Sequence, residues 1–259
     1  MTFSLRFTAD LIFALAARAI TNKNGFPFIL QLSPDTDFDT GAAALSASMP
    51  RVDNGSSQSS TLVPRYRSPI LWISGSEPLD HPEVPRFTNA LAASGRHVFL
   101  QTSGASLKRR LHEFQPSSRF YFAIHFDGLD PLPDRSSACD APFRVGIEAL
   151  RMARLAGFFT CAHLVVRPGA EDSKLEELHA EISKLDVDGF LLTPSALSPD
   201  LEQNVNRLRR RLLSRRWALL SDLVESVALP AASRNSRQTG RQPLSESQPD
   251  NFEEGAEAG

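Results

Sequence analysis

Apolar and polar residues follow one another in a regular order along the chain, with short apolar runs separated by longer amphipathic stretches. Several runs are almost continuously apolar, as at 70–73, which is typical of strands covered on both faces. The predicted strands are 27–33, 70–74, 97–102, 120–126, 158–166 and 189–193. The stretches with helical spacing predict helices at 83–93, 106–114, 143–156, 171–185, 199–214 and 217–227.

The predicted helix at 143–156 shows this spacing clearly. One face is apolar, and it comprises Phe143, Ile147, Leu150 and Ala153. The side chains expected to face away from it are Arg144, Arg151 and Arg154. Gly157 stands where a glycine commonly ends a helix.

Repeated strand–helix units predict parallel strands joined by right-handed crossovers, and therefore an α/β protein. Six strands are too few for an eight-stranded barrel, so the pattern leaves a partial barrel or an open doubly wound sheet. In both architectures, ligands bind at the carboxyl ends of the strands.

Two segments interrupt the strand–helix order. Residues 46–68 include Asn54-Gly55 and a run of serines, which predicts a flexible linker. Residues 231–259 are polar, and only Leu244 and Phe252 are large and apolar, so we expect a disordered tail. The sequence thus predicts one domain over 1–230, a linker within it at 46–68, and a tail at 231–259.

Composition removes several classes of protein. A formal net charge of −2 provides no overall field for nucleic acid, so none is expected as a partner. Two cysteines, Cys139 and Cys161, exclude a disulfide scaffold and any site that needs three thiolates. The apolar run at 11–20 contains Arg18 and is too short to span a bilayer, and Asp10 before it is unlike a signal peptide. We therefore expect a cytoplasmic protein.

Small and polar residues gather where the predicted strands end. Glu77 and Asp127 are suited to bind an ammonium group or ribose hydroxyls there. Taken singly, however, such residues also fit turns and helix caps. The segments are Ser74-Gly75-Ser76-Glu77-Pro78, Thr102-Ser103-Gly104, His125-Phe126-Asp127-Gly128, Arg167-Pro168-Gly169 and Thr193-Pro194-Ser195.

The order of these segments resembles the radical S-adenosylmethionine (radical SAM) superfamily. Gly75-Ser76-Glu77-Pro78 resembles its Gly-Gly-Glu-Pro motif, and Thr102-Ser103-Gly104 resembles its Thr-Asn-Gly strand end. The run from His125 to Leu129, with Asp134-Arg135-Ser136, resembles the hopanoid-biosynthesis branch. The resemblance implies a partial (β/α)6 TIM-like barrel that binds S-adenosylmethionine. The residues implied in binding are Gly75, Ser76, Glu77, Pro78, Ser103, His125 and Asp127.

One motif of that family is missing. Its members hold a [4Fe–4S] cluster on three thiolates spaced Cys-x3-Cys-x2-Cys after the first strand. Alignment of that strand places Phe38, Ala42 and Leu45 at the three positions, and none of them binds iron. We therefore expect no cluster. Binding of S-adenosylmethionine should be weakened, because the cosubstrate also chelates the missing iron.

These observations lead to three hypotheses. The first is a degenerate radical SAM-like protein that binds or scaffolds a partner, such as a cluster-bearing paralogue or another enzyme of its pathway. The second is an enzyme of hopanoid or lipid biosynthesis that transfers a 5'-deoxyadenosyl group. The third is a repurposed enzyme that uses Glu77, His125 and Asp127 in acid–base chemistry.

Both ends of the predicted domain carry amphipathic helices. Residues 207–227 join a basic run to an apolar stripe, which favours a helix pair at the barrel edge with a solvated arginine face. The alternative is peripheral contact with an anionic membrane or an acidic partner. Residues 8–20 are expected to form a helix across the bottom of the barrel, with Thr8 as its N-cap.

Overall fold

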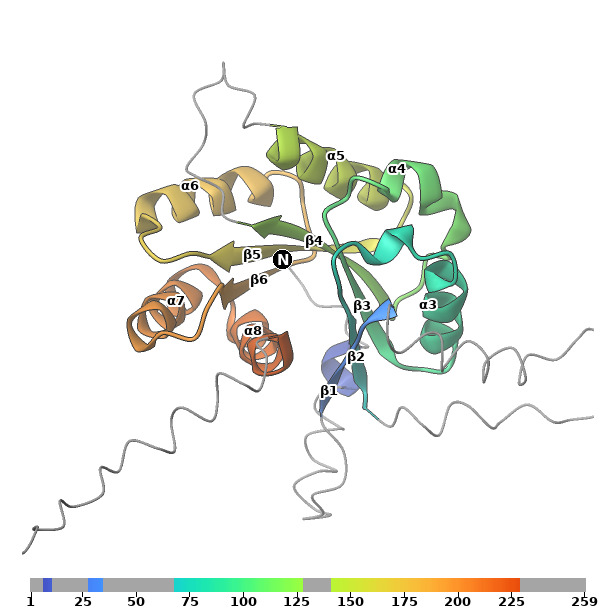
Figure 1. Ribbon diagram of the computed structural model, residues 1–259, viewed down its shortest axis with the longest axis horizontal. Coiled ribbons are helices and arrows are strands. Elements are labelled where there is room, and N and C mark those ends of the chain that lie inside the picture. The colour runs from blue at the N-terminus through green and yellow to red at the C-terminus, as the bar shows by residue number, and fades with distance from the viewer. Residues whose placement is uncertain (1–6, 11–27, 35–67, 128–140, 229–259) are drawn as a thin grey trace, which may run out of the picture. The chain divides into compact units, whose positions relative to one another are not determined.

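The computed structural model describes residues 7–10, 28–34, 68–127 and 141–228. Within these ranges, six parallel strands form one sheet in the order β1-β2-β3-β4-β5-β6, and the sheet curls into a half-barrel (Figure 1). This confirms the predicted α/β partial barrel. The strands are β1 (Ile29–Leu32), β2 (Ile70–Ile73), β3 (His97–Thr102), β4 (Phe120–Asp127), β5 (Phe159–Val166) and β6 (Gly189–Pro194).

Helices follow the strands as the sequence predicted, with one exception. The predicted helix at 106–114 divides into a short α4 and a 3-10 turn η4, and the segment ends before Pro116, which disfavours a helical conformation at the residue before it. The helical elements are η3 (Pro78–Asp80), α3 (Val84–Ala93), α4 (Leu107–Arg110), η4 (Leu111–Glu113), α5 (Ala141–Leu155), α6 (Asp172–Ser183), α7 (Pro199–Leu212) and α8 (Arg215–Ala228).

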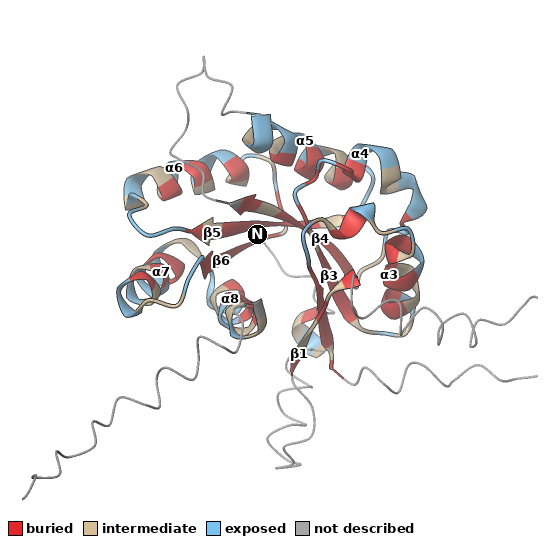
Figure 2. Cartoon of the chain, viewed as in Figure 1, coloured by how far each residue is buried: buried red, intermediate tan, exposed pale blue. Residues whose placement is uncertain are grey.

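The two faces of the sheet support separate cores, and the strands are buried throughout their middle (Figure 2). The convex face packs against the crossover helices through a large apolar cluster that includes Leu100, Phe122 and Phe190. The concave face is filled by a smaller cluster whose central members include Trp72, Phe99, Tyr121, Leu191 and Trp217. Burial on both faces explains why the strand sequences are almost continuously apolar.

Helix α8 contacts both edge strands, β6 and β1, and so bridges the open side of the half-barrel (Figure 1). Trp217 at its start packs on Gly189, where an added Cβ would lie 1.8 Å from the indole ring. One turn later, the Ser221 hydroxyl accepts a hydrogen bond of 3.1 Å from the Leu192 amide. From Gly189 to Leu192 along β6 and from Trp217 to Ser221 along α8, the contacts advance in the same direction. Helix α8 therefore runs parallel to β6, and its C-terminal end lies toward the carboxyl edge of the sheet.

Residues 7–10 are helical and lie at the opposite, amino edge of the sheet. Phe7 is 1% exposed, and its ring packs edge-on against that of His97 with 4.6 Å between the ring centroids. The Asp10 carboxylate accepts hydrogen bonds from His97 Nε2 at 3.0 Å and from Arg119 at 3.1 Å. Burial alone would raise the pKa of Asp10, but these two partners lower it below its usual value.

This placement agrees with the predicted cover of the barrel bottom as far as residues 7–10 extend. The predicted N-cap at Thr8 is wrong, because Phe7 is already helical. The Thr8 hydroxyl instead accepts a hydrogen bond of 3.0 Å from Arg216 of α8. The remainder of the predicted helix at 8–20 lies outside the described residues.

Helix α5 confirms the predicted amphipathic pattern with one correction. Gly157 follows it at a φ of +83°, as expected of a glycine that ends a helix. Arg154, however, does not face away from the protein. Its guanidinium donates to Asp188 at 2.9 Å and to Asp186 at 2.5 Å, because the loop before β6 brings both carboxylates beneath the helix.

Other predictions fall on residues that the structure leaves undescribed. These are the linker at 46–68, apart from Ser68, and the tail at 231–259. None of the helices in the described ranges combines the length and apolarity that crossing a membrane requires.

Candidate ligand-binding site at the carboxyl edge of the sheet

The segment after β2 lies where the strand ends converge. The Ser74 amide donates to the Leu32 carbonyl at 3.0 Å, and its hydroxyl accepts a hydrogen bond of 2.8 Å from the Gln31 side chain. Gly75 and Ser76 are exposed, and Pro78 is buried as the first residue of η3. The backbone at positions 75 and 76 is therefore accessible at this edge.

Glu77 joins the ends of β2 and β3. Its Oε1 accepts hydrogen bonds from the Thr102 hydroxyl at 2.6 Å and the Leu79 amide at 3.3 Å. Its Oε2 accepts from the Ser103 amide at 3.0 Å and the Ser103 hydroxyl at 2.5 Å. An ionised carboxylate offers about four acceptor sites. Glu77 thus holds the loop in place, and its capacity to bind an ammonium group or ribose is largely used.

A hydrogen-bonded chain crosses the concave face just below this rim. The Trp72 indole N–H donates to Gln101 Oε1 at 3.2 Å, which fixes the orientation of the amide. Gln101 Nε2 then donates to His125 Nδ1 at 2.6 Å. Since Nδ1 is an acceptor in this arrangement, the neutral imidazole of His125 carries its proton on Nε2.

His163 on β5 lies beside this chain. Its ring meets His125 edge-on at 5.3 Å and Trp72 edge-on at 5.4 Å, and Nε2 lies 2.9 Å from the Thr193 hydroxyl. Burial is the main cause that lowers the pKa of His163 well below its usual value, and the charge of Arg209, together with that of His125 whenever that ring is protonated, acts in the same direction. Nδ1 of this neutral ring has no hydrogen-bond partner among the described residues.

Together these side chains form a polar layer, which we define as Trp72, Gln101, His125, His163 and Thr193. Of these five, the sequence indicated His125 as a binding residue and Thr193 as a strand-end residue, but not Trp72, Gln101 or His163. Gln101 and His163 could have been found in the sequence, because each is a polar residue within an otherwise apolar strand. Such positions are informative because an unpaired buried polar group is costly.

The other predicted site residues are less fully placed. Asp127 is the last residue of β4 and its backbone pairs with Val165, but its side chain is not described. Phe38, Ala42 and Leu45 lie outside the described residues, as does Cys139. Cys161 is 0% exposed in β5, and burial raises the pKa of its thiol. In the described ranges, no three His, Cys, Asp or Glu side chains come together as metal ligands.

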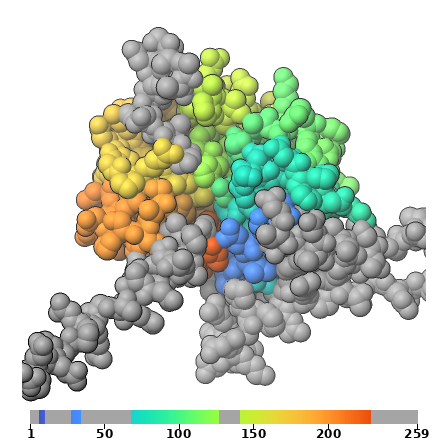
Figure 3. All heavy atoms as spheres, viewed as in Figure 1, coloured from blue at the N-terminus to red at the C-terminus, as the bar shows by residue number. Residues whose placement is uncertain are grey.

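The arginines of α7 and α8 are more engaged than the sequence suggested. Arg209 is 2% exposed and donates to the Leu192 carbonyl, Asp222 and Glu225. Arg207 and Arg211 of α7 pair with acidic residues of α6, and Figure 3 shows the orange atoms of α7 beside the yellow atoms of α6. Arg210, Arg215 and Arg216 remain exposed. Contact of this region with an anionic membrane stays a prediction.

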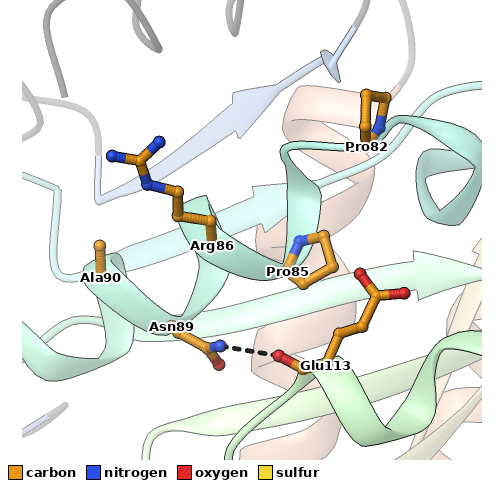
Figure 4. Close-up of a pocket in the computed structure, with 6 residues that line it drawn as sticks. All are labelled: Pro82, Pro85, Arg86, Asn89, Ala90 and Glu113. Atoms are coloured by element: carbon orange, nitrogen blue, oxygen red, sulfur yellow. Dashed lines mark hydrogen bonds between the residues drawn. The ribbon is translucent and has the colours of Figure 1, made fainter. Parts of the chain in front are cut away.

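A shallow pocket of about 440 Å³ lies away from the sheet edge, on the outer side of α3 (Figure 4). Asn89 closes one side by donating to the Glu113 carbonyl at 3.0 Å, and its amide oxygen accepts from Gln115 at 3.1 Å. These polar groups are already paired. The pocket contains none of the predicted site residues; its lining is Pro82, Pro85, Arg86, Asn89, Ala90 and Glu113.

The fold and this edge define a class: a partial parallel α/β barrel with its candidate site at the carboxyl ends of the strands. Residues 61–182 match the family model of the radical SAM superfamily, and this part of the chain is therefore a radical SAM superfamily domain. The match begins after the positions 38–45 at which the family's cysteines were sought. No curated protein matches the chain.

Solved structures show a similar fold. Streptococcus suis SuiB bound to S-adenosylmethionine gives a TM-score of 0.51 at 11% identity, covering 76% of this chain and 48% of that chain. Archaeal TYW1 gives a TM-score of 0.41 at 17% identity, covering 57% of this chain and 51% of that chain. The chain thus spans about half the length of the solved structures it matches. At such identities, the likeness extends to the fold alone.

Proposed function

We propose that this chain is a degenerate radical SAM-like protein that holds no [4Fe–4S] cluster and acts as a binding or scaffolding partner. The proposal rests on the number of cysteine thiolates that the chain can provide as ligands. The sequence has two cysteines, and Cys161 is sealed in β5 with 0% exposure. That leaves Cys139 for a cluster that needs three thiolate ligands. The residues present therefore do not fit the cluster.

The rim of the barrel supports a role in binding. The backbone is exposed at Gly75 and Ser76, and Glu77 is hydrogen-bonded to Ser103. This edge of the sheet is therefore ordered and accessible to a ligand. We expect S-adenosylmethionine to bind there weakly, with Pro78, His125 and Asp127 in the surrounding shell. The partner would be a cluster-bearing paralogue or an enzyme of the same pathway.

The packing of the barrel interior favours this role over hopanoid chemistry. A hopene is a large apolar molecule and needs an apolar space of its own size. The lower interior is filled by Phe99 and Tyr121, each 0% exposed, and the layer above them is polar. We therefore rank transfer of a 5'-deoxyadenosyl group to a hopanoid or another lipid second. Acid–base chemistry ranks third, because Glu77 is already held by several donors.

Anaerobic reconstitution tests the proposal. The purified chain is incubated with iron and sulfide, desalted, and examined by metal analysis and visible absorption. We expect no stoichiometric iron. A [4Fe–4S] absorption spectrum with four irons per chain would overturn the proposal, and a Cys139→Ser variant would report whether iron binds at that loop thiol alone.

A matched variant tests the alignment behind the proposal. The triple substitution Phe38→Cys, Ala42→Cys and Leu45→Cys restores the spacing Cys-x3-Cys-x2-Cys. If these are the lost ligand positions, the triple variant should gain a cluster under the same conditions. Calorimetry with S-adenosylmethionine on both proteins then measures the remaining pocket, and binding should be tighter in the variant. Absence of heat from both at millimolar ligand would show that the pocket is lost.

A further inference from the structure

The turn between α7 and α8 carries positive charge that the fold does not neutralise. Residues 203–221 include six arginines and no acidic residue. Arg209 is paired by two acidic residues of α8, and Arg207 and Arg211 are paired by acidic residues of α6. The remaining three are exposed and have no ion pair among the described residues. We call them the basic corner, and they are Arg210, Arg215 and Arg216.

Leu219 adds an apolar side chain to the basic corner. It is 39% exposed, and it lies one helical turn after Arg215 and Arg216 on α8. Asp222, the next acidic residue along this helix, is paired with Arg209. The surface therefore combines unpaired cations with an exposed leucine, which is the combination that helices at a membrane interface present.

The basic corner lies at the amino edge of the sheet, where α7 ends and α8 begins beside β6 (Figure 1). Trp217, the residue after the corner, packs on Gly189 at the start of β6. Arg216 donates to the Thr8 hydroxyl at 3.0 Å, and Thr8 belongs to the helical residues at the same edge. The candidate site is at the opposite edge, so a surface bound by the corner leaves that site accessible.

We propose that this chain binds peripherally to an anionic lipid surface through the basic corner, with Leu219 inserted between the headgroups. The lipid phosphates supply negative charge to all three guanidinium groups, and the leucine is favoured by leaving water. An acidic protein would complement the arginines but would leave the exposed leucine unexplained. Each arginine near an anionic surface strengthens binding about fivefold, so three of them give a weak and reversible attachment. The proposal is independent of whether a cluster binds.

Co-sedimentation of the full chain with lipid vesicles tests the proposal. We expect binding to vesicles of equal parts phosphatidylserine and phosphatidylcholine, and none to vesicles of phosphatidylcholine alone. Binding should fall as the salt concentration rises from about 0.05 to 0.5 M, because ions screen the attraction. Equal binding to both kinds of vesicle, or no binding to either, would overturn the proposal.

A matched pair of double variants locates the binding surface. Arg210→Glu with Arg215→Glu should weaken binding to the anionic vesicles at least about tenfold. Arg144→Glu with Arg151→Glu changes the net charge equally on α5, where Glu148 stands between the two exposed arginines, and should weaken binding much less. An equal loss in both would show that net charge alone determines binding, and the proposed surface would be wrong.

Brominated lipids test whether position 219 enters the membrane. Leu219→Trp places an indole there, and bromine on the acyl chains quenches its fluorescence on contact. Trp72 and Trp217 are 0% and 1% exposed, so the wild-type chain provides the unquenched background. A vesicle-bound variant that shows no more quenching than the wild type would overturn the proposed insertion.

Polyglutamate tests the alternative of an acidic protein partner. It should compete with the anionic vesicles only weakly, because it gains nothing from Leu219. If the chain instead binds polyglutamate through Arg210 and Arg215 and leaves anionic vesicles unbound, the corner recognises an acidic protein and the membrane proposal is wrong.

Discussion

The lower and upper parts of the barrel interior are built on the same strands but differ in chemistry. Below, Phe99 and Tyr121 stack at 4.6 Å and pack with Leu191. Above, the polar layer runs from Gln101 through His125 to His163. On β3 the change takes place between Phe99 and Gln101, two residues along one strand face. The lower half stabilises the fold, whereas the upper half keeps polar groups ordered beneath an accessible rim.

The first prediction removes the largest side chain of the lower half. Trp217→Ala should lower the free energy of unfolding by about 3–5 kcal/mol, because the cavity left against Gly189 cannot close. Urea denaturation followed by circular dichroism measures the loss. Leu155→Ala is the control, since that side chain is 89% exposed, and it should change stability by less than about 0.5 kcal/mol.

The second prediction concerns the rim. Glu77→Gln replaces an acceptor oxygen by an NH₂ group that faces the donors of Thr102 or Ser103. Leaving such donors unsatisfied should cost about 1.5–3 kcal/mol. The same denaturation experiment applies, with Glu83→Gln on the surface as the control. Equal losses in the two variants would mean that the Glu77 link does not stabilise the rim.

The third prediction uses the pH dependence of the polar layer. His163 has a lowered pKa in the folded protein, so below about pH 6.5 the unfolded chain binds a proton that the folded chain does not. Stability should therefore fall as the pH falls from about 6.5 toward 5, by up to about 1.4 kcal/mol per pH unit. Half-buried His179 also has a pKa lowered by burial and adds to the same trend.

His163→Gln should flatten this acid limb, measured as the slope of unfolding free energy against pH. The slope isolates the titration from any constant loss that the substitution causes. His112→Gln changes an exposed histidine and should leave the slope as it is. A wild-type slope in the His163 variant would show that the ring is protonated in the folded state over this range.

The smallest effect is expected at the amino edge, below the apolar half. The lowered pKa of Asp10 contributes stability above about pH 4, and this contribution is lost as the pH falls through the folded-state value. At neutral pH, Asp10→Asn should cost less than about 1 kcal/mol, because the carboxylate is 37% exposed. In thermal melts, the difference between variant and wild type should be larger at pH 7 than at pH 3, with Asp200→Asn as the control.

The fold was predictable from the sequence because its signals are local. Residues 97–102 form β3 with the predicted bounds, since an apolar run between a glycine-containing turn and a small-residue segment has few alternatives. The small and polar segments at the carboxyl ends of the strands were predictable for the same reason, because each directly follows such an apolar run. The bonds of the polar layer join Gln101 to His125 and His163 to Thr193, across 24 and 30 residues. They depend on strand register and sheet curvature, which no local pattern contains.

The burial of Arg209 was hidden from the sequence in a similar way. In the sequence, Arg209 stands within a run of arginines, and nothing local distinguishes it from the exposed arginines beside it. Only the packing of α7 against both β6 and α8 brings the Leu192 carbonyl, Asp222 and Glu225 around this one guanidinium. The course of α8 parallel to β6 therefore determines that Arg209, among the arginines of this run, is the buried one.

The direction of α8 also governs how the protein can be attached to a surface. Residues 7–10 lie at the amino edge of the sheet, while α8 delivers Ala228 toward the edge that carries Glu77 and Ser103. A fusion partner or affinity handle joined after α8 therefore begins beside the candidate site and obstructs it. Immobilisation through the N-terminal side orients that edge toward solution, and binding measurements with the two placements should differ for any ligand of the rim.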